Sequence, residues 1–421
     1  MLDIKFIREN PNLIKEAARK KGVKFDVDQL LAVDERRRHV LQELENTRAK
    51  QNAGSRGGPK APAELEELKK LKEEIKVLEE EMGRVEQEFN ELMLWVPQVP
   101  DSSVPEGKTD TDNVEIRKWG KIPKFNFPVK DNIALMETLD MLDLERGAKV
   151  SGFRGYFLKN GAVLLSHALW NFVLEKFVKK GYKPLIAPTI ARESNFVGTG
   201  WLPQGRDEMY KIGDDEFLVG TSEISVMGYH ADEILQEKDL PKKYIAFSPC
   251  YRSEAGSYGK DTKGIMRVHE FYKLEQVILC KADHEESVKW HEEITRNSEE
   301  IVQALKLPYR VVVNCAGDLG LGQVKKYDIE TWMPSQERYR ETHSASYFHD
   351  FQTRRLNIRY RDTSGKMHFA HSLNNTALAT PRILANIVEN YQTKKGTVVV
   401  PKVLRKWMGG VKEISARSLK N

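Results

Sequence analysis

Residues Cys250–Glu275 read CYRSEAGSYGKDTKGIMRVHEFYKLE, and this stretch decides the fold of the C-terminal part of the chain. The residues around its start, Lys242–Arg252, are rich in the aromatic and branched side chains that strands favour. Three glycines within Ala255–Gly264 indicate a turn. We expect Ile265–Leu279 to return as the second strand of a β-hairpin.

Charged side chains follow one face of each predicted strand. Because side chains alternate along a strand, one face of the return strand consists of Arg267, His269, Phe271, Lys273 and Glu275. Arg252 and Glu254 share a face of the first strand. Such charges are costly to bury unless they are paired or bind a ligand. The hairpin is therefore either an ordinary one with a solvated face or a site for a triphosphate, a purine ring and an amine.

The composition is that of an ordinary globular protein with more than one domain, since the chain has 421 residues and 40% of them are apolar. Cys250, Cys280 and Cys315 lack metal-ligand spacing, so we expect no zinc and three buried, unpaired thiols in a reducing compartment. There is no run of about 18 apolar residues and no signal-peptide core, which indicates a cytoplasmic protein without a membrane span. The net charge is +5, so a nucleic acid would need a local basic surface.

The N-terminal third carries the heptad pattern of a coiled coil. Its stronger seam takes alternating steps of three and four residues through Leu68, Leu71, Ile75, Leu78, Met82, Val85, Phe89 and Leu92. A weaker seam takes such steps through Leu30, Val33, Arg37, Val40, Leu44 and Thr47. The glycines and prolines of Asn52–Pro62, between the seams, predict a turn. We expect an antiparallel helical hairpin whose helices have roughly 25–30 residues each, which makes an arm roughly 40 Å long.

Two uses of this arm are open. Oligomerisation is the commonest use of a coiled coil. The alternative is contact with a phosphate backbone, because basic residues follow the first helix and the tip: Arg36, Arg37, Arg38, Arg48, Lys50, Arg56 and Lys60. Lysine and arginine at phosphates give affinity without reading bases. The second helix mixes Glu with Lys, as solvated faces do.

The rest of the chain divides at a proline-rich segment. Val96–Lys130 contains five prolines and a polar run, so we interpret it as a linker. Gly161–Lys180 has the apolar spacing of a helix. We predict an N-terminal arm domain over residues 1–110 and a second domain over residues 111–421.

Four segments resemble motifs of one family, and they follow each other in that family's order. Lys180–Ile190 resembles motif 1 of the class II aminoacyl-tRNA synthetases, and Val219–Ser225 resembles the serine-binding TxE segment of the seryl-tRNA synthetases. Phe247–Glu275 resembles motif 2 in its seryl form, and His371–Gln392 resembles motif 3. The resemblance runs from residue 1 to about Gly410. It implies an α+β fold, with an antiparallel β-sheet core flanked by helices and an N-terminal coiled-coil arm.

The resemblance also implies an activity. Seryl-tRNA synthetases activate serine with ATP to seryl-adenylate and transfer serine to the 3′ end of tRNA(Ser). Arg252 and Arg382 are implied as catalytic residues. The implied ATP-binding residues are Arg252, Ser253, Glu254, Arg267, Val268, Phe271, Glu341, Thr342, His343, Ser344 and Arg382. The implied serine-binding residues are Thr221, Ser222, Glu223, Arg252, Glu275, Asn374 and Thr376.

The family assigns roles at the nucleotide end of this site. Arg252 would hold the α-phosphate and the serine carboxylate, since a guanidinium offers a planar fork of donors. Glu254 would accept a hydrogen bond from the adenine amino group, and Phe271 would stack on the ring. Arg267 and Arg382 would meet the triphosphate.

It also assigns a metal and an amino-acid pocket. Within Glu341–Ser344, the glutamate and the serine would coordinate Mg²⁺, which prefers hard oxygen ligands. Thr221 and Glu223 would take the α-ammonium of serine. Glu275 and Thr376 would hydrogen-bond its hydroxyl group, a recognition that rejects alanine by a factor on the order of 10⁴.

Two details of the site are specific to this chain. His343 stands where the family usually has a small serine, so the geometry near ATP or the metal is expected to differ there. Thr380 is predicted as the N-cap of a helix that starts at Pro381, which would put Arg382 in its first turn.

Three functions therefore remain to be separated. The first is a serine–tRNA ligase that acts as a homodimer and binds tRNA(Ser) and its long variable arm through the helical hairpin, with tRNA(Sec) as an open second substrate. The second is a class II ligase that activates an amino acid for another acceptor, against which the arm speaks. The third is a non-catalytic RNA-binding relative, which would be expected to have lost residues of the site.

Overall fold

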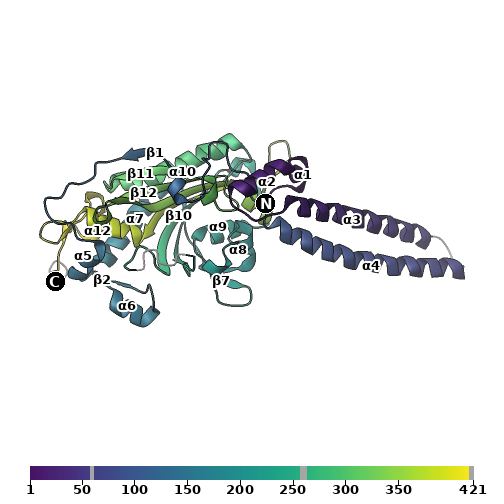
Figure 1. Ribbon diagram of the computed structural model, residues 1–421, viewed down its shortest axis with the longest axis horizontal. Coiled ribbons are helices and arrows are strands. Elements are labelled where there is room, and N and C mark those ends of the chain that lie inside the picture. Colours follow the sequence, from purple (N-terminus) through teal and green to yellow (C-terminus); the bar gives the residue numbers. More distant parts are fainter. Residues whose placement is uncertain (57–60, 257–262, 417–421) are drawn as a thin grey trace. The chain divides into compact units, whose positions relative to one another are not determined.

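The computed structural model describes residues 1–56, 61–256 and 263–416. The chain forms two compact units, Met1–Val99 and Pro100–Asn421 (Figure 1). Lys60 and most of the predicted turn over Ala255–Gly264 lie outside the described residues. Each unit has an apolar core of its own, so each is described by itself.

The N-terminal unit consists of helices α1 (Ile4–Glu9), α2 (Pro11–Lys20), α3 (Val27–Ser55) and α4 (Pro62–Met93). Asp26 caps α3, because its carboxylate accepts hydrogen bonds from the first backbone N–H groups of the helix. The helices share a small apolar core at the base of the long pair, made of Ile7, Ile14, Val27, Leu30, Met93 and Val96. Beyond it, α3 and α4 pack against each other as the predicted antiparallel arm.

Both predicted seams lie between the two long helices. Every residue of the stronger seam is buried or half-buried, and Val40 and Leu44 of the weaker seam form one apolar cluster with Ile75 and Leu78. The predicted turn is wrong at its start, because α3 continues through Asn52–Ser55. Gly54 is the one strong helix breaker there, and a single glycine costs a helix only about 1 kcal/mol.

Arg37 lies at a core position of the weaker seam, where contacts that its sequence neighbours do not predict hold its charged side chain. Its guanidinium lies 4.4 Å from the centre of the Phe89 ring and 3.1 Å from the carboxylate of Asp34, which is fully buried. Arg8 and Arg38 also approach Asp34, at 3.5 Å and 3.3 Å. Three cations around one buried carboxylate compensate for its loss of hydration.

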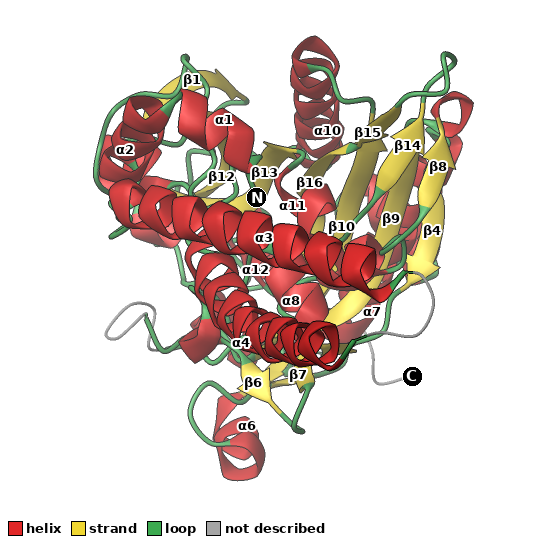
Figure 2. Cartoon of the chain, turned by 90° about the vertical axis from the view of Figure 1, so that its right-hand side faces the viewer, coloured by secondary structure: helices red, strands yellow, loops and turns green. Residues whose placement is uncertain are grey.

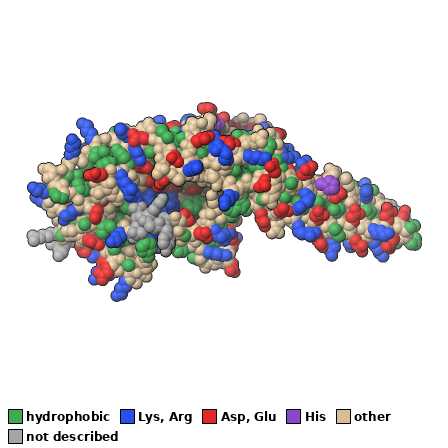
Figure 3. All heavy atoms as spheres, in the orientation of Figure 1, with side chains coloured by type: hydrophobic (Ala, Val, Ile, Leu, Met, Phe, Trp, Pro, Cys, Tyr) green, Lys and Arg blue, Asp and Glu red, His purple; other side chains and the backbone are tan. Residues whose placement is uncertain are grey.

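Several of the predicted basic contacts are paired inside the arm. Arg36 binds Glu88 at 2.5 Å and Arg48 binds Glu79 at 2.6 Å, both across the two helices. Figure 3 shows Lys and Arg interspersed with Asp and Glu along the arm. Exposed pairs of this kind contribute at most about 1 kcal/mol each, so a phosphate could replace the carboxylate at little cost.

The C-terminal unit is built on an eight-stranded sheet. In spatial order, its strands are β1 (Val114–Trp119), β11 (Tyr309–Val313), β12 (Lys325–Met333), β13 (Arg338–His349), β16 (His371–Thr380), β10 (Glu270–Cys280), β9 (Lys242–Tyr251) and β4 (Lys183–Ile186). Neighbouring strands are antiparallel except β4 and β9, which are parallel. The predicted antiparallel sheet core is thereby confirmed, with one parallel pair at its edge.

The predicted hairpin, formed by β9 and β10, lies near one edge of this sheet. β9 and β10 pair with Glu275 opposite Ala246. The return strand begins at Glu270 and not at Ile265 as predicted. Ile265 and Met266 instead enter the apolar core.

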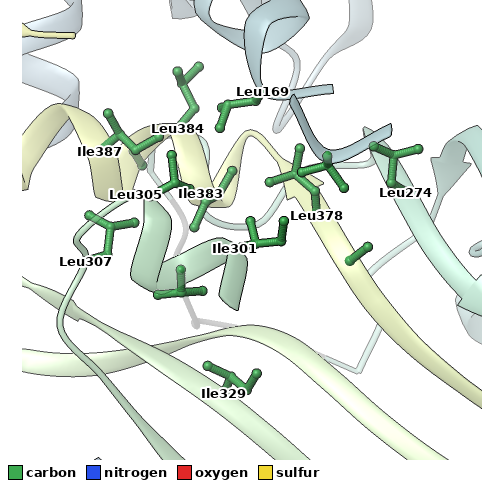
Figure 4. Close-up of a cluster of buried hydrophobic side chains, with 14 of the residues drawn as sticks. Leu169, Leu274, Ile301, Leu305, Leu307, Ile329, Leu378, Ile383, Leu384 and Ile387 are labelled. Atoms are coloured by element: carbon green, nitrogen blue, oxygen red, sulfur yellow. The ribbon is translucent and has the colours of Figure 1, made fainter. Parts of the chain in front are cut away.

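Helices cover the two faces of the sheet unequally (Figure 2). α7 (Gly161–Lys179, as predicted), α10 (His284–Ala304) and α12 (Arg382–Asn390) pack on one face through a continuous apolar cluster. Figure 4 shows its centre, where Ile301 of α10 and Leu305, the residue after that helix, approach Ile383 of α12. α9 (Ser222–Gly228) contacts strands of the sheet through a separate apolar cluster. α11 (Phe351–Arg355) contacts β16 and β13, and α8 (Glu193–Thr199) contacts both helices.

The remaining elements are short. One three-stranded sheet consists of β5 (Ile190–Arg192), β7 (Glu216–Leu218) and β6 (Tyr210–Lys211), and another consists of β15 (Met367–Phe369), β14 (Arg359–Arg361) and β8 (Ile234–Gln236). Two strand pairs are formed by β2 (Leu142–Asp143) with β3 (Phe157–Leu158) and by β17 (Val398–Val399) with β18 (Glu413–Ile414). Two further helices are α5 (Asn132–Thr138) and α6 (Leu144–Ser151).

The proline-rich segment is more structured than predicted. β1 lies inside the predicted linker and forms the edge of the main sheet, where it pairs with β11. Before it, the backbone N–H of Asp101 donates to the carbonyl of Val324, and the carbonyl of Pro105 accepts from Ala316. Residues 100–110 thus bond to the second unit, although the predicted boundary put them in the first.

Two absences concern the described residues. Within them, no helix is both long and apolar enough to cross a membrane. All three cysteines are buried and free, as predicted.

Candidate active site

A cavity of about 930 Å³ opens on the C-terminal unit, and most of the predicted site residues line it. These are Thr221, Glu223, Arg252, Glu254, Arg267, Val268, Phe271, Glu275, Glu341, Thr342, Ser344, Asn374, Thr376 and Arg382. Many of them lie on β10, β13 and β16, which are neighbours at the centre of the sheet. Figure 3 shows Lys and Arg side chains at a recess beside the undescribed grey atoms.

Three predicted residues do not line the cavity. Ser222 is fully buried and donates to the carbonyl of Ala246 at 3.2 Å. The hydroxyl of Ser253 donates to the carbonyl of Asp207 at 2.5 Å. His343 is the third.

His343 lies in the core because side chains alternate on β13. Thr342 and Ser344 line the cavity on either side of it. The His343 ring is buried, with Nδ1 at 2.9 Å from the Thr342 hydroxyl, and burial lowers its pKa to about 4. The imidazole is therefore neutral at pH 7. Because the His343 side chain faces away from the cavity, the structure does not support the expectation that this histidine changes the geometry near ATP or the metal.

Arg252 lines the cavity and contacts two aromatic rings. Its guanidinium carbon is 5.5 Å from the ring centre of Trp201 and 5.4 Å from that of Phe271. One terminal nitrogen donates to the carbonyl of Gly220 at 3.3 Å. The Nε atom is buried without a hydrogen-bond partner among the described residues. A buried donor held in this way is poised for an anionic ligand.

The other two arginines of the site hold carboxylates. Arg267 donates to Glu254 at 2.5 Å. Arg382 lies 3.4 Å from the carboxylate of Glu341 and also donates to its carbonyl at 3.0 Å. Both guanidinium groups face the cavity, so a triphosphate would meet two cations that are already oriented.

The predicted cap of the last site helix is wrong. Pro381 is the N-cap of α12, and Thr380 is still the last residue of β16. The Thr380 hydroxyl donates to the carbonyl of Tyr272 at 3.2 Å, so it is engaged within the sheet. Arg382 is nevertheless the first residue of the helix, as the prediction required for its place in the first turn.

Two buried carboxylates mark the inner end of the cavity. Glu275 pairs with Lys273 at 2.8 Å. The side chains of Lys273, Glu275 and Glu223 are all almost completely buried. Desolvation raises the pKa of Glu223, whereas a hydrogen bond from Gln352 at 2.6 Å lowers it and the charge of Glu275 raises it further. Because two carboxylates lie near only one lysine, the local charge favours the binding of a second cation, such as an α-ammonium group.

Glu341 provides an acidic group at the opposite end. Desolvation raises its pKa, but the cations Arg382, Lys326 and Arg252 outweigh this and lower it. Its neighbour Asp328 is buried, which raises the pKa of that carboxyl to about 6. The carboxyl of Glu341 is therefore the more acidic of the two.

The described residues fit a magnesium ion that is bound mainly by phosphates. Within these ranges, no group of three or more His, Cys, Asp or Glu has the geometry of a metal site. Glu341 and Ser344 both offer hard oxygens to the cavity. Mg²⁺ commonly takes one or two protein ligands and completes its shell with phosphate and water.

The sequence analysis missed several residues of the site. Lys326 and Asp328 alternate with buried Tyr327 on β12, a signal of period two that the sequence does carry. Trp201 and Gln352 lie in segments without a chemical motif, and it is tertiary packing that brings them to Arg252 and Glu223.

Comparison with known proteins agrees with this geometry. Residues 1–100 match the seryl-tRNA synthetase N-terminal domain, and residues 210–391 match the tRNA synthetase class II core domain (G, H, P, S and T). The serine–tRNA ligase of Deinococcus radiodurans is 44% identical over 416 residues, which cover 97% of this chain and 98% of that relative.

Two solved structures are similar over the full length. The seryl-tRNA synthetase of Pyrococcus horikoshii, complexed with ATP, has a TM-score of 0.91 and 41% identity, with 99% of both chains covered. The cytoplasmic serine–tRNA ligase of Naegleria fowleri, in complex with AMP, has a TM-score of 0.88 and 34% identity, with 100% and 99% covered. This chain belongs to the seryl-tRNA synthetase family of class II aminoacyl-tRNA synthetases.

Proposed function

We propose that this protein is a serine–tRNA ligase, which joins serine to ATP and then to the 3′ end of tRNA(Ser). The observation that carries this proposal is that one cavity holds Arg252, the buried carboxylates Glu223 and Glu275, and the cations Arg267 and Arg382. This set of groups matches an ammonium group, a reacting carboxylate and α-phosphate, and a triphosphate. Family membership gives the same activity.

The first step is a displacement at phosphorus. A carboxylate oxygen of serine forms a bond to the α-phosphorus, and the bond from that phosphorus to the bridging oxygen breaks. The electron pair of the broken bond stays on pyrophosphate. Arg252 holds both reacting groups and offsets the charge that develops between them, so catalysis comes from position and electrostatics without a protein nucleophile.

The amino-acid end of the cavity selects serine. Glu223 and Thr221 bind the α-ammonium, and Glu275 and Thr376 bind the hydroxyl group; the latter two lie opposite each other on β10 and β16. Bound Mg²⁺ at Glu341 and Ser344 would neutralise phosphate charge. In the second step, the 3′-terminal hydroxyl of the tRNA attacks the seryl carbonyl and AMP leaves.

The exchange of labelled pyrophosphate into ATP tests the first step across all amino acids. We expect serine to support exchange and alanine to support it less by a factor on the order of 10⁴, since alanine leaves the hydroxyl-binding groups unpaired. Chelation of Mg²⁺ should stop the reaction. If another amino acid supported exchange and serine did not, the substrate assignment would be wrong.

The exposed apolar residues at one edge of the sheet support a homodimer. Strand β4 ends the main sheet, and Ile186 on it is 87% exposed. Ile190, which follows β4, and Leu164 and Val178 of α7 are also exposed. Apolar side chains at an open strand edge favour pairing with another chain, and we propose that a second copy covers them.

We expect Ile186→Asp to convert this dimer to a monomer, because a charge would be buried at the centre of the interface. Light scattering coupled to size exclusion measures the mass. Val77→Asp on α4 is the matched control, since Val77 is 60% exposed in the N-terminal unit. A wild-type monomer, or an Ile186→Asp variant that remains dimeric, would contradict the proposed interface.

The absence of paired cysteines also supports the proposed cytoplasmic location. Cys250, Cys280 and Cys315 are free and buried, which suits a compartment in which thiols stay reduced.

A further inference from the structure

A buried glutamine lies directly behind the amino-acid end of the cavity. Gln352 belongs to α11, and only 1% of its surface is exposed. It is not among the described residues that line the cavity, whereas Glu223 is. The Nε2 atom of Gln352 donates to Oε1 of Glu223 at 2.6 Å. Gln352 can therefore influence a bound substrate only through the groups that it contacts.

Three hydrogen bonds fix the orientation of the Gln352 amide. Besides its bond to Glu223, Nε2 donates to the carbonyl of Thr199 at 3.1 Å. On the other side of the amide, Oε1 accepts from the hydroxyl of Ser372 at 2.7 Å. A carboxylate and a carbonyl can only accept, so the amide nitrogen must face them. The amide cannot turn over without bringing its own oxygen against two acceptors.

The three partners of this amide come from separate elements. Glu223 lies in the first turn of α9, Thr199 is the last residue of α8, and Ser372 is on β16. Ser372 is fully buried, and its strand lies between β13 and β10. Through Gln352, the position of the Glu223 carboxylate is thus tied to the middle of the main sheet.

The surroundings of Glu223 disfavour its charge. Desolvation raises its pKa, and the nearby carboxylate of Glu275 raises it further. The hydrogen bond from Gln352 is the largest of the influences that lower this pKa, ahead of the charge of Lys273 and a hydrogen bond from Asn374. Lys273 is also paired with Glu275 at 2.8 Å. A neutral donor therefore supports the negative charge that a cationic ligand requires.

We propose that Gln352 is a positioning residue for the α-ammonium group of the amino-acid substrate. Its amide keeps the Glu223 carboxylate ionised and in place at the cavity, where the ammonium group binds. Thr199 and Ser372 keep the amide turned toward Glu223. This inference rests on the proposed function for the pairing of Glu223 with the ammonium group, but it does not depend on which amino acid is activated.

Gln352→Met tests this role in the exchange reaction, because methionine has a similar size but cannot donate. We expect the KM for the amino acid to rise about tenfold at pH 7, since one hydrogen bond to a charged group is lost. Without that donor the pKa of Glu223 is higher, so the rise in KM should be larger at pH 6 and smaller at pH 8.5. The KM for ATP should change by less than about threefold. Gln392→Met is the matched control, since Gln392 is also buried and its amide donates to the carbonyls of Lys130 and Glu389, neither of which is among the described residues that line the cavity.

Two further variants separate positioning from a general loss of packing. Ser372→Ala removes only the donor to Oε1 of Gln352, so we expect the KM for the amino acid to rise about threefold, again more at pH 6 than at pH 8.5. In a Glu223→Gln background, Gln352→Met should change this KM by less than about twofold, because the group through which Gln352 acts is no longer a carboxylate.

The pH dependence decides the outcome. A KM for the amino acid that is unchanged in Gln352→Met, or that rises equally at pH 6 and pH 8.5, would overturn the inference, because packing alone does not follow the ionisation of Glu223. If Gln352→Met does not fold, an unchanged KM in Ser372→Ala at both pH values would overturn it instead. If another amino acid supported exchange and serine did not, the proposed function would fail, but a pH-dependent rise in the KM for that amino acid would still support the role of Gln352.

Discussion

Arg252→Ala is expected to lower serine-dependent ATP–pyrophosphate exchange by about 10³-fold, the upper range for removal of one positioned donor to a developing charge. The guanidinium contacts Trp201 and Phe271, and its Nε is buried and oriented toward no protein acceptor in the described part of the chain. Truncation removes the only group assigned to hold both the α-phosphate and the serine carboxylate. The loss should therefore fall on kcat more than on the KM for ATP.

Arg252→Lys is the informative companion variant. Lysine keeps the charge but loses the planar fork, so we expect it to restore a small part of the activity. Thermal unfolding of both variants is the control for folding, because the guanidinium also contacts Trp201, Phe271 and the carbonyl of Gly220. Exchange within tenfold of wild type in Arg252→Ala would remove this residue from the catalytic role.

Removal of the outer arm has the second largest expected effect. If residues 40–85 are replaced by a short Gly-Ser linker, charging of tRNA(Ser) should fall more than about a hundredfold, since phosphate contacts supply much of the affinity for nucleic acids. Serine-dependent exchange should stay within about twofold, because the cavity lies entirely in the C-terminal unit. The apolar core at the base of the arm, which includes Leu30 and Met93, is retained.

The salt dependence and a truncated RNA give the controls for this deletion. Binding of tRNA(Ser) to the full chain should weaken steeply with salt, and the deletion should flatten that slope. A transcript without its long variable arm should be charged equally poorly by both proteins. Unchanged charging of the full tRNA by the shortened protein would show that the arm serves another purpose, such as oligomerisation.

Local periodicity made the arm and the central hairpin predictable. Heptad spacing fixes which residues of α3 and α4 face each other, and alternation fixes which side chains of β10 reach the cavity. The motif order then located most of the residues that line it. These patterns depend on neighbours within a few residues along the chain.

The features that were missed depend on partners far away in the sequence. The sequence of β1 predicts a linker because the strand forms only by pairing with β11, almost two hundred residues later. The buried Asp34 was missed because its cations include Arg8 from another helix. The His343 side chain could be assigned to the core only once the register of β13 was known, with His343 opposite Ile329.

The place of β16 in the sheet bears on how the protein is made. This strand lies between β13 and β10, although it is the last of the eight to leave the ribosome. A nascent chain that ends before His371 has two half-sheets with no strand to join them. The residues of β10 and β13 that line the cavity lie on either side of β16, so a ligand of this cavity can stabilise only a chain whose synthesis is nearly finished.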